Sequence, residues 1–230
     1  MNNDLLENLV KSLGISRDQV LREEAELSVL DAIANHSLGE RVIFYGGTAL
    51  RLAYGSPRFS EDIDLIRMKS FPFSEFDRFA REVAGKHEGW TLSDIKEKRN
   101  TFFALFLIRH PQLKHSFSLK IELHIPSKKI SLSNQLMLIK SPASVLEPLL
   151  LVPTLDELKD LKEKALMGRK KARDLFDLWY IAQVSRAPLT LPGVLPEFSE
   201  REFKNELKVF LPRKYFPIID QLYEQSQRKN

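Results

Sequence analysis

Apolar residues recur at three- and four-residue intervals along some stretches of the chain and alternate with polar residues along others. Apolar positions recur at helical spacing over residues 17–36 and therefore predict a helix, which begins at the capping box Ser16–Gln19. The same spacing predicts a helix over residues 74–84 and further helices from Thr154 onward. Shorter apolar or alternating runs predict strands at residues 41–45, 61–68, 101–108 and 116–125.

The order of these elements places mixed helices and strands first and helices last. A short helix is expected over residues 48–54, and residues 142–151 are expected to form an apolar, proline-punctuated connection. Thr154 opens a second capping box, after which the pattern is helical. We therefore expect an α+β domain over residues 1–145, followed by a helical C-terminal domain over residues 146–230.

Composition narrows the classes of protein to which the chain can belong. Its 230 residues are 43% hydrophobic, which suffices for a sizeable core. Without an apolar run of membrane-spanning length, or a basic-then-apolar N-terminus, we expect neither a transmembrane helix, nor a secretory signal, nor a membrane partner. The chain has no cysteine, which excludes disulfides and thiolate metal sites and favours a cytoplasmic location.

The charge of the chain is mildly basic, with a net charge of +4 and a pI near 9.2. Residues 159–173 hold an unusual share of the cations, opposed there only by Asp160 and Glu163. Charge alone favours a solvated helix face, and attraction of phosphates is the alternative. The cations are Lys159, Lys162, Lys164, Arg169, Lys170, Lys171 and Arg173.

Two acids interrupt the strand predicted at residues 61–68. Because strand side chains alternate between faces, Asp62 and Asp64 share one face, while Ile63 and Leu65 share the other. Like charges this close are tolerated when they are solvated, paired with cations or bound to a divalent metal. Ligation by oxygen atoms alone favours Mg²⁺ or Mn²⁺ over zinc.

A third acid follows the same logic. Glu122 lies on the polar face of the strand predicted at residues 116–125. If that strand neighbours Asp62 and Asp64, the three carboxylates form a cluster able to hold two metal ions. Such a pair of ions activates an attacking hydroxyl and stabilises a leaving pyrophosphate.

Gly46 and Gly47 stand between the strand at residues 41–45 and the short helix after it. A glycine pair there lets backbone N–H groups approach an anion at the positive end of the helix dipole, and Thr48 can donate its hydroxyl. Alone, the glycines are an ordinary turn, the acids a solvated strand edge, Arg58 a surface cation and Ser60 a turn residue. Only their combination points to a nucleoside triphosphate (NTP) site.

That combination resembles the nucleotidyltransferase superfamily with a polymerase-β-like core. More narrowly, it resembles the AbiEii/AbiGii toxin family, which includes the MenT toxins. The first matching motif comprises Gly46, Gly47, Thr48, Leu50, Tyr54, Gly55, Arg58, Ser60, Asp62 and Asp64. The second comprises Lys162, Ala165, Leu166, Arg169, Arg173, Asp174, Asp177 and Leu178.

The resemblance implies a mixed sheet with flanking helices and a role for each matched polar residue. Asp62 and Asp64 are expected to hold the metal ions, with Glu122 as third ligand or general base. Lys162 is expected to contact the triphosphate, with Lys164 as the alternative, and Asp174 or Asp177 to support the site. The residues expected to bind the nucleotide are Gly46, Gly47, Thr48, Arg58, Ser60 and Asp177.

The expected activity is metal-dependent transfer of a nucleoside monophosphate from an NTP to an acceptor, with Mg²⁺ or Mn²⁺ as cofactor and pyrophosphate as product. The resemblance implies that the acceptor is the 3′ end of a tRNA and that the chain is a toxin silenced by an antitoxin. A protein or small-molecule acceptor would require the same chemistry. A non-catalytic nucleotide-binding module is the other alternative.

Overall fold

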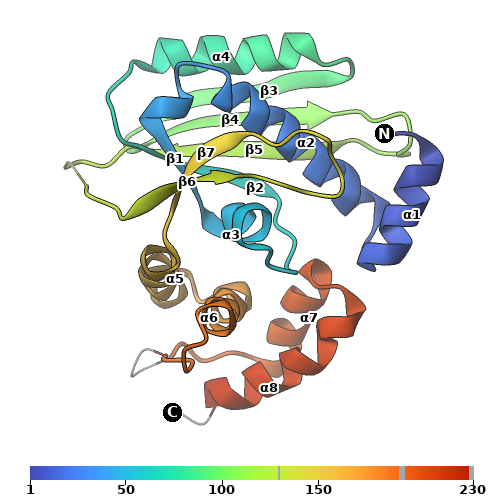
Figure 1. Ribbon diagram of the computed structural model, residues 1–230, viewed down its shortest axis with the longest axis vertical. Coiled ribbons are helices and arrows are strands. Elements are labelled where there is room, and N and C mark those ends of the chain that lie inside the picture. Colours follow the sequence, from blue (N-terminus) through green and yellow to red (C-terminus); the bar gives the residue numbers. More distant parts are fainter. Residues whose placement is uncertain (129, 192–194, 228–230) are drawn as a thin grey trace.

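The computed structural model describes residues 1–128, 130–191 and 195–227, which form an upper group of elements around a sheet and a lower group of helices (Figure 1). The upper group comprises α1 (Asn3–Leu13), α2 (Arg17–Ala34), η1 (Gly39–Arg41), β1 (Val42–Tyr45), α3 (Gly46–Tyr54), β2 (Asp62–Arg67), α4 (Phe73–Lys86), β3 (Trp90–Lys98), β4 (Thr101–Ile108), β5 (Phe117–His124), β6 (Asn134–Leu138) and β7 (Leu149–Pro153). The lower group comprises α5 (Leu155–Arg169), α6 (Ala172–Val184), α7 (Glu200–Phe210), η2 (Arg213–Tyr215) and α8 (Phe216–Gln227).

The described residues form a mixed five-stranded sheet in the order β1-β2-β5-β4-β3. β2 and β5 are parallel, whereas the other neighbouring strands are antiparallel. Along β4, buried and less buried side chains alternate, so this strand contributes every second residue to the core. The mixed sheet with flanking helices confirms the predicted fold class.

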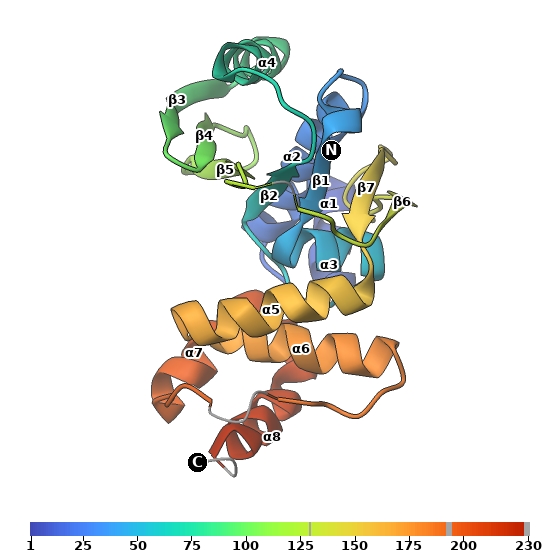
Figure 2. The same cartoon turned by 90° about the vertical axis from the view of Figure 1, so that its left-hand side faces the viewer.

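Helix α4 covers β3 and β4 and is held there by its apolar stripe (Figure 2). Its N-cap, Pro72, makes no capping bond through its side chain, so capping adds little. Burial of each large apolar side chain contributes roughly 1.5–3 kcal/mol, which outweighs any cap. The buried residues recur at the helical spacing from which this helix was predicted: Phe76, Phe79, Ala80 and Val83.

The structure differs from the predictions at the start of α3, in elements that were not predicted, and at residues 142–151. Helix α3 begins at Gly46, directly after β1, rather than at residue 48. Helix α1 and strands β3 and β6 were not predicted. The expected connection at residues 142–151 instead leads into β7, which pairs with β6 and buries Leu150 and Val152 in the core of the upper group.

One contact between the upper and lower groups is made by α3. Leu50 of α3, Leu158 of α5 and Ile181 of α6 form a small buried cluster at this junction. The Tyr180 hydroxyl donates to the carbonyl of Tyr54 at 2.7 Å, which ties α6 to the end of α3. Within the described part of the chain, no helix is both long and apolar enough to span a membrane.

Candidate active site

Asp62 and Asp64 project from the same face of β2, and β5 lies beside them. In the parallel register, Asp64 is paired with Glu122 and Asp62 with Lys120. The intervening Ile63 is fully buried on the other face. The predicted alternation of β2 is thus confirmed, and the condition that the strand of Glu122 adjoins it is met.

The Lys120 ammonium lies between two of the three acids. Its Nζ is 3.1 Å from Oδ2 of Asp62 and 3.1 Å from Oε2 of Glu122. Burial disfavours this ammonium, but Asp62 and Glu122 together raise the pKa of Lys120. No role for Lys120 was predicted. Its place two residues before Glu122, on the same strand face, is the signal that could have indicated one.

The Asp64 carboxylate has no such counter-ion. Among the described residues, none forms a hydrogen bond or ion pair with its side chain. Burial, followed by the charge of Asp62, raises the pKa of Asp64 to about 6, although Lys162 opposes this effect. A bound cation would therefore stabilise the ionised form of this crowded, unpaired carboxylate.

Gly46 is required by the close approach of α3 to Asp64. Its φ is +86°, in the left-handed region, and a Cβ at this position would overlap the Asp64 carboxylate. A Cβ at Gly47 would likewise overlap the guanidinium of Arg58. The N-cap Tyr45 makes no capping bond through its side chain, so the first N–H groups of α3 keep their capacity to bind an anion.

The acids have the donor atoms that a divalent cation prefers, but their side chains do not form a complete set of metal ligands. In the described ranges, no group of three or more His, Cys, Asp or Glu side chains is arranged to hold a metal ion. Oxygen donors and the unpaired Asp64 suit Mg²⁺ or Mn²⁺ at Asp62 and Asp64. Glu122 shares the Lys120 ammonium with Asp62, so the role of Glu122 as third metal ligand stays a prediction.

A second charged cluster joins α5 and α6 to the segment before β2. The Nζ of Lys162 is 2.6 Å from Oδ2 of Asp177 and 3.3 Å from Oδ1 of Asp174. Arg58 forms two bonds to Asp177, at 2.7 and 2.8 Å. Arg169 forms two bonds to Asp174, both at 2.7 Å. Both acids are fully buried, and their contacts fix the cations in place.

This cluster carries a surplus positive charge, because three cations surround two acids. Burial opposes ionisation of Asp177, but Arg58 and Lys162 outweigh it and hold the pKa of Asp177 below its usual range. The hydrogen bonds to Asp174 raise the pKa of Arg169, and the negative charge of Asp64 raises it further. The surplus charge therefore lies within the electrostatic reach of Asp64.

A hollow of about 530 Å³, here called the central hollow, separates the acids from this cluster. Asp64 and Glu122 line it from the sheet, whereas Lys162, Lys164 and Arg169 line it from α5. Gly46 also lines the hollow, so the predicted site residues in its lining are Gly46, Asp64, Glu122 and Lys162. The predicted residues outside the lining are Asp62, Gly47, Thr48, Arg58, Ser60, Asp174 and Asp177.

Two of the predicted nucleotide-binding residues make contacts within the protein. Thr48 is fully buried and its hydroxyl donates to the carbonyl of Asp62, so it fixes the start of β2. Arg58 is buried against Asp177 and positions the carboxylate that holds Lys162. Direct contact of Thr48 or Arg58 with a nucleotide stays a prediction.

Comparison with known proteins identifies relatives of this arrangement. Residues 28–225 match the family profile described as "Nucleotidyl transferase AbiEii toxin, Type IV TA system". A search of curated protein sequences gives no match. Among solved structures, the nucleotidyltransferase toxin MenT4 of Mycobacterium tuberculosis is similar, with a TM-score of 0.67 and 19% identity over 100% of this chain and 93% of that one.

Two structures from Helicobacter pylori are also similar. JHP933 has a TM-score of 0.55 and 18% identity over 94% of this chain and 96% of that one. A putative nucleotidyltransferase has a TM-score of 0.56 and 16% identity over 94% of this chain and 99% of that one. At these identities the structures support the fold, whereas the family profile covers most of the sequence.

Proposed function

The chain belongs to the AbiEii family of nucleotidyltransferase toxins, and we propose that it transfers the nucleoside monophosphate of an NTP to the 3′ end of an RNA, with tRNA as the acceptor class. The family places the chain among nucleotidyltransferases of type IV toxin–antitoxin systems. Metal dependence, the acceptor and the residue roles given below are our proposal.

One observation carries this proposal: the two walls of the central hollow have opposite charge. Asp64 and Glu122 form the acidic wall, and on the α5 wall Lys162, Lys164 and Arg169 outnumber the single acid, Glu157. An NTP needs both walls. The basic wall would attract its negatively charged phosphates, and the acidic wall would hold the metal ions that contact its α-phosphate. A hollow of about 530 Å³ is within the ordinary size range of nucleotide-sized sites.

Each side chain then has a distinct task. Asp62 and Asp64 would hold Mg²⁺ or Mn²⁺, which when bound lowers the barrier to attack and to departure of pyrophosphate. Glu122 would accept the proton of the attacking hydroxyl. Lys162 and Arg169 would neutralise the charge that develops on the leaving pyrophosphate.

We favour Lys162 over Lys164 as the triphosphate lysine. Lys162 is 5% exposed and is held by Asp174 and Asp177, whereas Lys164 is exposed on the surface of α5. A charge held in place needs no reorganisation during the reaction and is therefore the better electrostatic catalyst. Asp174 and Asp177 act as positioning residues, and Arg58 acts through Asp177.

The family description implies a cognate antitoxin, and we propose a cytoplasmic site of action, where NTPs and tRNA are found. The packing of β7 with the sheet also leads us to propose a domain boundary at Thr154 rather than between residues 145 and 146.

The test is to incubate the purified chain with each labelled NTP, Mg²⁺ or Mn²⁺, and total RNA. We expect one NTP to leave its label on the 3′ end of small RNAs and to release pyrophosphate. The control is the variant carrying both Asp62→Asn and Asp64→Asn. Label on protein or on a small molecule would refute the RNA acceptor, and absence of any metal-dependent turnover would refute catalysis.

A further inference from the structure

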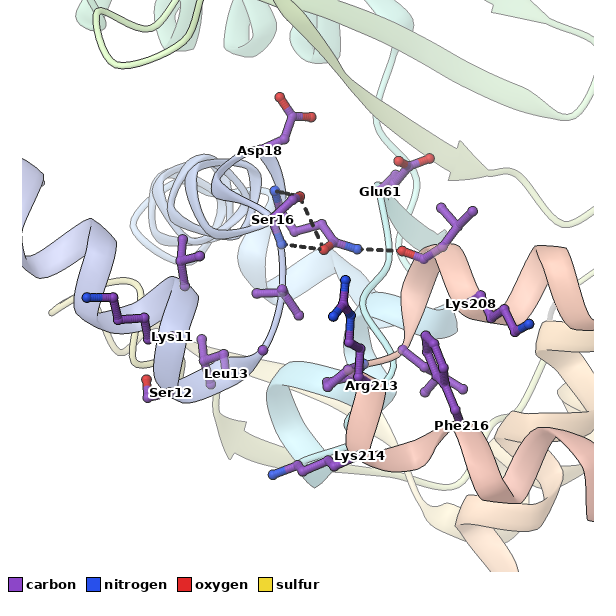
Figure 3. A pocket seen from close by; sticks show the side chains of 17 residues that line it. Lys11, Ser12, Leu13, Ser16, Asp18, Glu61, Lys208, Arg213, Lys214 and Phe216 are labelled. Atoms are coloured by element: carbon purple, nitrogen blue, oxygen red, sulfur yellow. Dashed lines mark hydrogen bonds between the residues drawn. The ribbon is translucent and has the colours of Figure 1, made fainter.

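A second and larger hollow, here called the terminal groove, lies between the turn that joins α1 to α2 and the segment from α7 to α8 (Figure 3). Its volume is about 900 Å³, and among the described residues it shares no lining side chain with the central hollow. The Gln19 side chain donates to the carbonyl of Val209 at 2.7 Å and ties the two walls together. The terminal groove is therefore a site distinct from the central hollow.

The terminal groove carries a surplus of positive charge. Lys11 comes from its α1 wall, and Lys208, Arg213 and Lys214 come from its other wall. Within the described part of the chain, none of these four forms an ion pair with an acid. Figure 3 shows the Arg213 side chain extending into the space between the walls. Cations without acidic partners attract a polyanion.

The acids in the lining do not cancel this charge. Asp18 already contacts Arg22 at 3.7 Å and His115 at 3.0 Å. That leaves Glu61 alone against the four cations. An aromatic side chain is also present, because Phe216 lines the groove with the Lys208 ammonium 5.9 Å from its ring centroid. A groove that binds single-stranded nucleic acid combines cations along the phosphate backbone with aromatic rings on which bases stack.

The position of Glu61 links the terminal groove to the catalytic strand. Glu61 lines the groove, Asp62 follows it at the start of β2, and Asp64 lines the central hollow. The backbone N–H of Phe59 donates to the carbonyl of Phe210 at 2.8 Å, which fixes this segment against the end of α7. The start of β2 thus lies between the two hollows.

We propose that the terminal groove binds the backbone of the single-stranded 3′ segment of the acceptor RNA and directs its terminal hydroxyl to Asp62 from the side of Glu61. The proposal rests on the function proposed above, because it assigns the acceptor of the same reaction. It assigns the RNA to a surface other than residues 159–173, where many of the cations are already paired. Those pairs are Lys159 with Glu163, Lys162 with Asp174 and Asp177, Arg169 with Asp174, and Arg173 with Glu206.

The test uses the full chain carrying Arg213→Glu and Lys214→Glu, and a fluorescent single-stranded RNA of about 12 nucleotides with a free 3′ hydroxyl. Binding is measured by anisotropy over a range of salt concentrations, without NTP. We expect the Kd to rise at least ~10-fold at 0.1 M salt and the salt slope to fall by about 1.4, because two phosphate contacts of ~0.7 each are lost. Binding of NTP with Mg²⁺ should be unchanged.

The matched control carries Arg78→Glu and Lys86→Glu, two exposed cations on α4, and changes the net charge equally. Helix α4 lies at the opposite end of the molecule from α7 and α8 (Figure 1). A second variant, Lys11→Glu, tests the α1 wall if the double variant does not fold. Wild-type affinity and slope in the groove variants, or an equal loss in the control, would overturn the proposal.

The two proposals fail differently. If wild-type chain binds the RNA through the groove but no NTP yields pyrophosphate, the proposed function is wrong and the groove remains a single-strand site. If the groove variants label RNA and bind it like the parent, only the groove assignment is wrong.

Discussion

The Arg58 guanidinium and the Asp177 carboxylate form a two-bond ion pair between the segment before β2 and helix α6. Nε meets Oδ1 at 2.7 Å and Nη2 meets Oδ2 at 2.8 Å. Arg58 is 2% exposed and Asp177 is fully buried. Lys162 meets the same carboxylate at 2.6 Å, so one acid joins the segment before β2 to the α5 lysine.

Asp177→Ala should destabilise the fold strongly, because it leaves Arg58 and Lys162 buried with less compensating charge. Loss of one partner from a buried pair typically costs about 3–5 kcal/mol in the free energy of unfolding. Urea denaturation measures this loss. Asp77→Ala is the control, since it breaks only the exposed contact of Asp77 with Arg81 on α4 and should change little. Equal losses in the two variants would contradict a structural role for the buried pair.

Asp64→Asn should abolish nucleotide transfer and raise the metal-free Tm. The folded pKa of Asp64 is about 6, above its usual value of 3.8, so its carboxylate destabilises the fold progressively as pH rises between these values. The gain in Tm should be full above pH 6 and absent below pH 4. Asp62→Asn should also abolish transfer but without the gain, because Asp62 pairs with Lys120. Thermal melts and turnover assays measure both, and transfer at the parent rate would refute the metal assignment.

The sequence predicted the parts of the site that local patterns define. Alternation on β2 placed Asp62 and Asp64 together, and the same alternation placed Glu122 on the polar face of its strand. The relation between these strands is set by the order of the sheet, which the periodicity of one segment does not encode. The adjacency of Asp64 and Glu122 was therefore a conditional prediction, which the parallel register of β2 and β5 confirms.

The remaining features depend on contacts distant in sequence. The Lys120 bridge requires the side-by-side placement of β2 and β5. Strand β3 was missed because it is an edge strand without a fully buried side chain, and a register shift between Leu92 and Asp94 interrupts the alternation of its apolar residues. The strand β6 is also largely exposed, and β7 is recognisable only once β6 pairs with it. The Arg58–Asp177 pair joins positions 119 residues apart.

Lys162→Ala should lower the rate of turnover more than it weakens NTP binding. A lysine directed at the developing pyrophosphate charge acts mainly in the transition state, and loss of such a contact costs about 10²–10³ in kcat. The fold should survive, because Asp177 keeps Arg58 and Asp174 keeps Arg169. Steady-state release of pyrophosphate gives kcat and KM. Lys164→Ala is the comparison, and a larger loss there would transfer the role to Lys164.

Glu26→Gln should stabilise the protein at alkaline pH. Glu26 is buried on α2, and its Oε1 has no hydrogen-bond partner among the described residues. Burial and then Glu23 raise the pKa of Glu26 well above its usual value of 4.5, so the neutral acid is the form that the fold favours. The stability that Glu26 contributes is present below pH 4.5 and is lost as pH rises through the folded pKa. Denaturation midpoints at pH 4.5 and 8 test this.

The expected result for Glu26→Gln is a higher midpoint than the parent at pH 8 and a matching midpoint at pH 4.5. Glu82→Gln, on the exposed face of α4, removes the same charge at the surface and should show no such pH dependence. A constant difference between Glu26→Gln and the parent at both pH values would show that Glu26 is charged in the fold.

Lys120→Met should make the protein more dependent on a divalent cation. The Lys120 ammonium is within 3.1 Å of both Asp62 and Glu122, where it neutralises the acids in the absence of metal. Methionine keeps much of the apolar stem but removes that charge, so the metal-free Tm should fall and Mn²⁺ should raise the Tm by more than in the parent. Lys98→Met is the matched control, because among the acids of the described residues Lys98 pairs with Glu122 alone, at 3.9 Å, and not with Asp62. Thermal melts with and without Mn²⁺ measure the effect, and titration of Mn²⁺ followed by its magnetic resonance signal gives the affinity. If Lys120→Met matches the parent in both measurements, the ammonium is not the resident counter-ion of these acids.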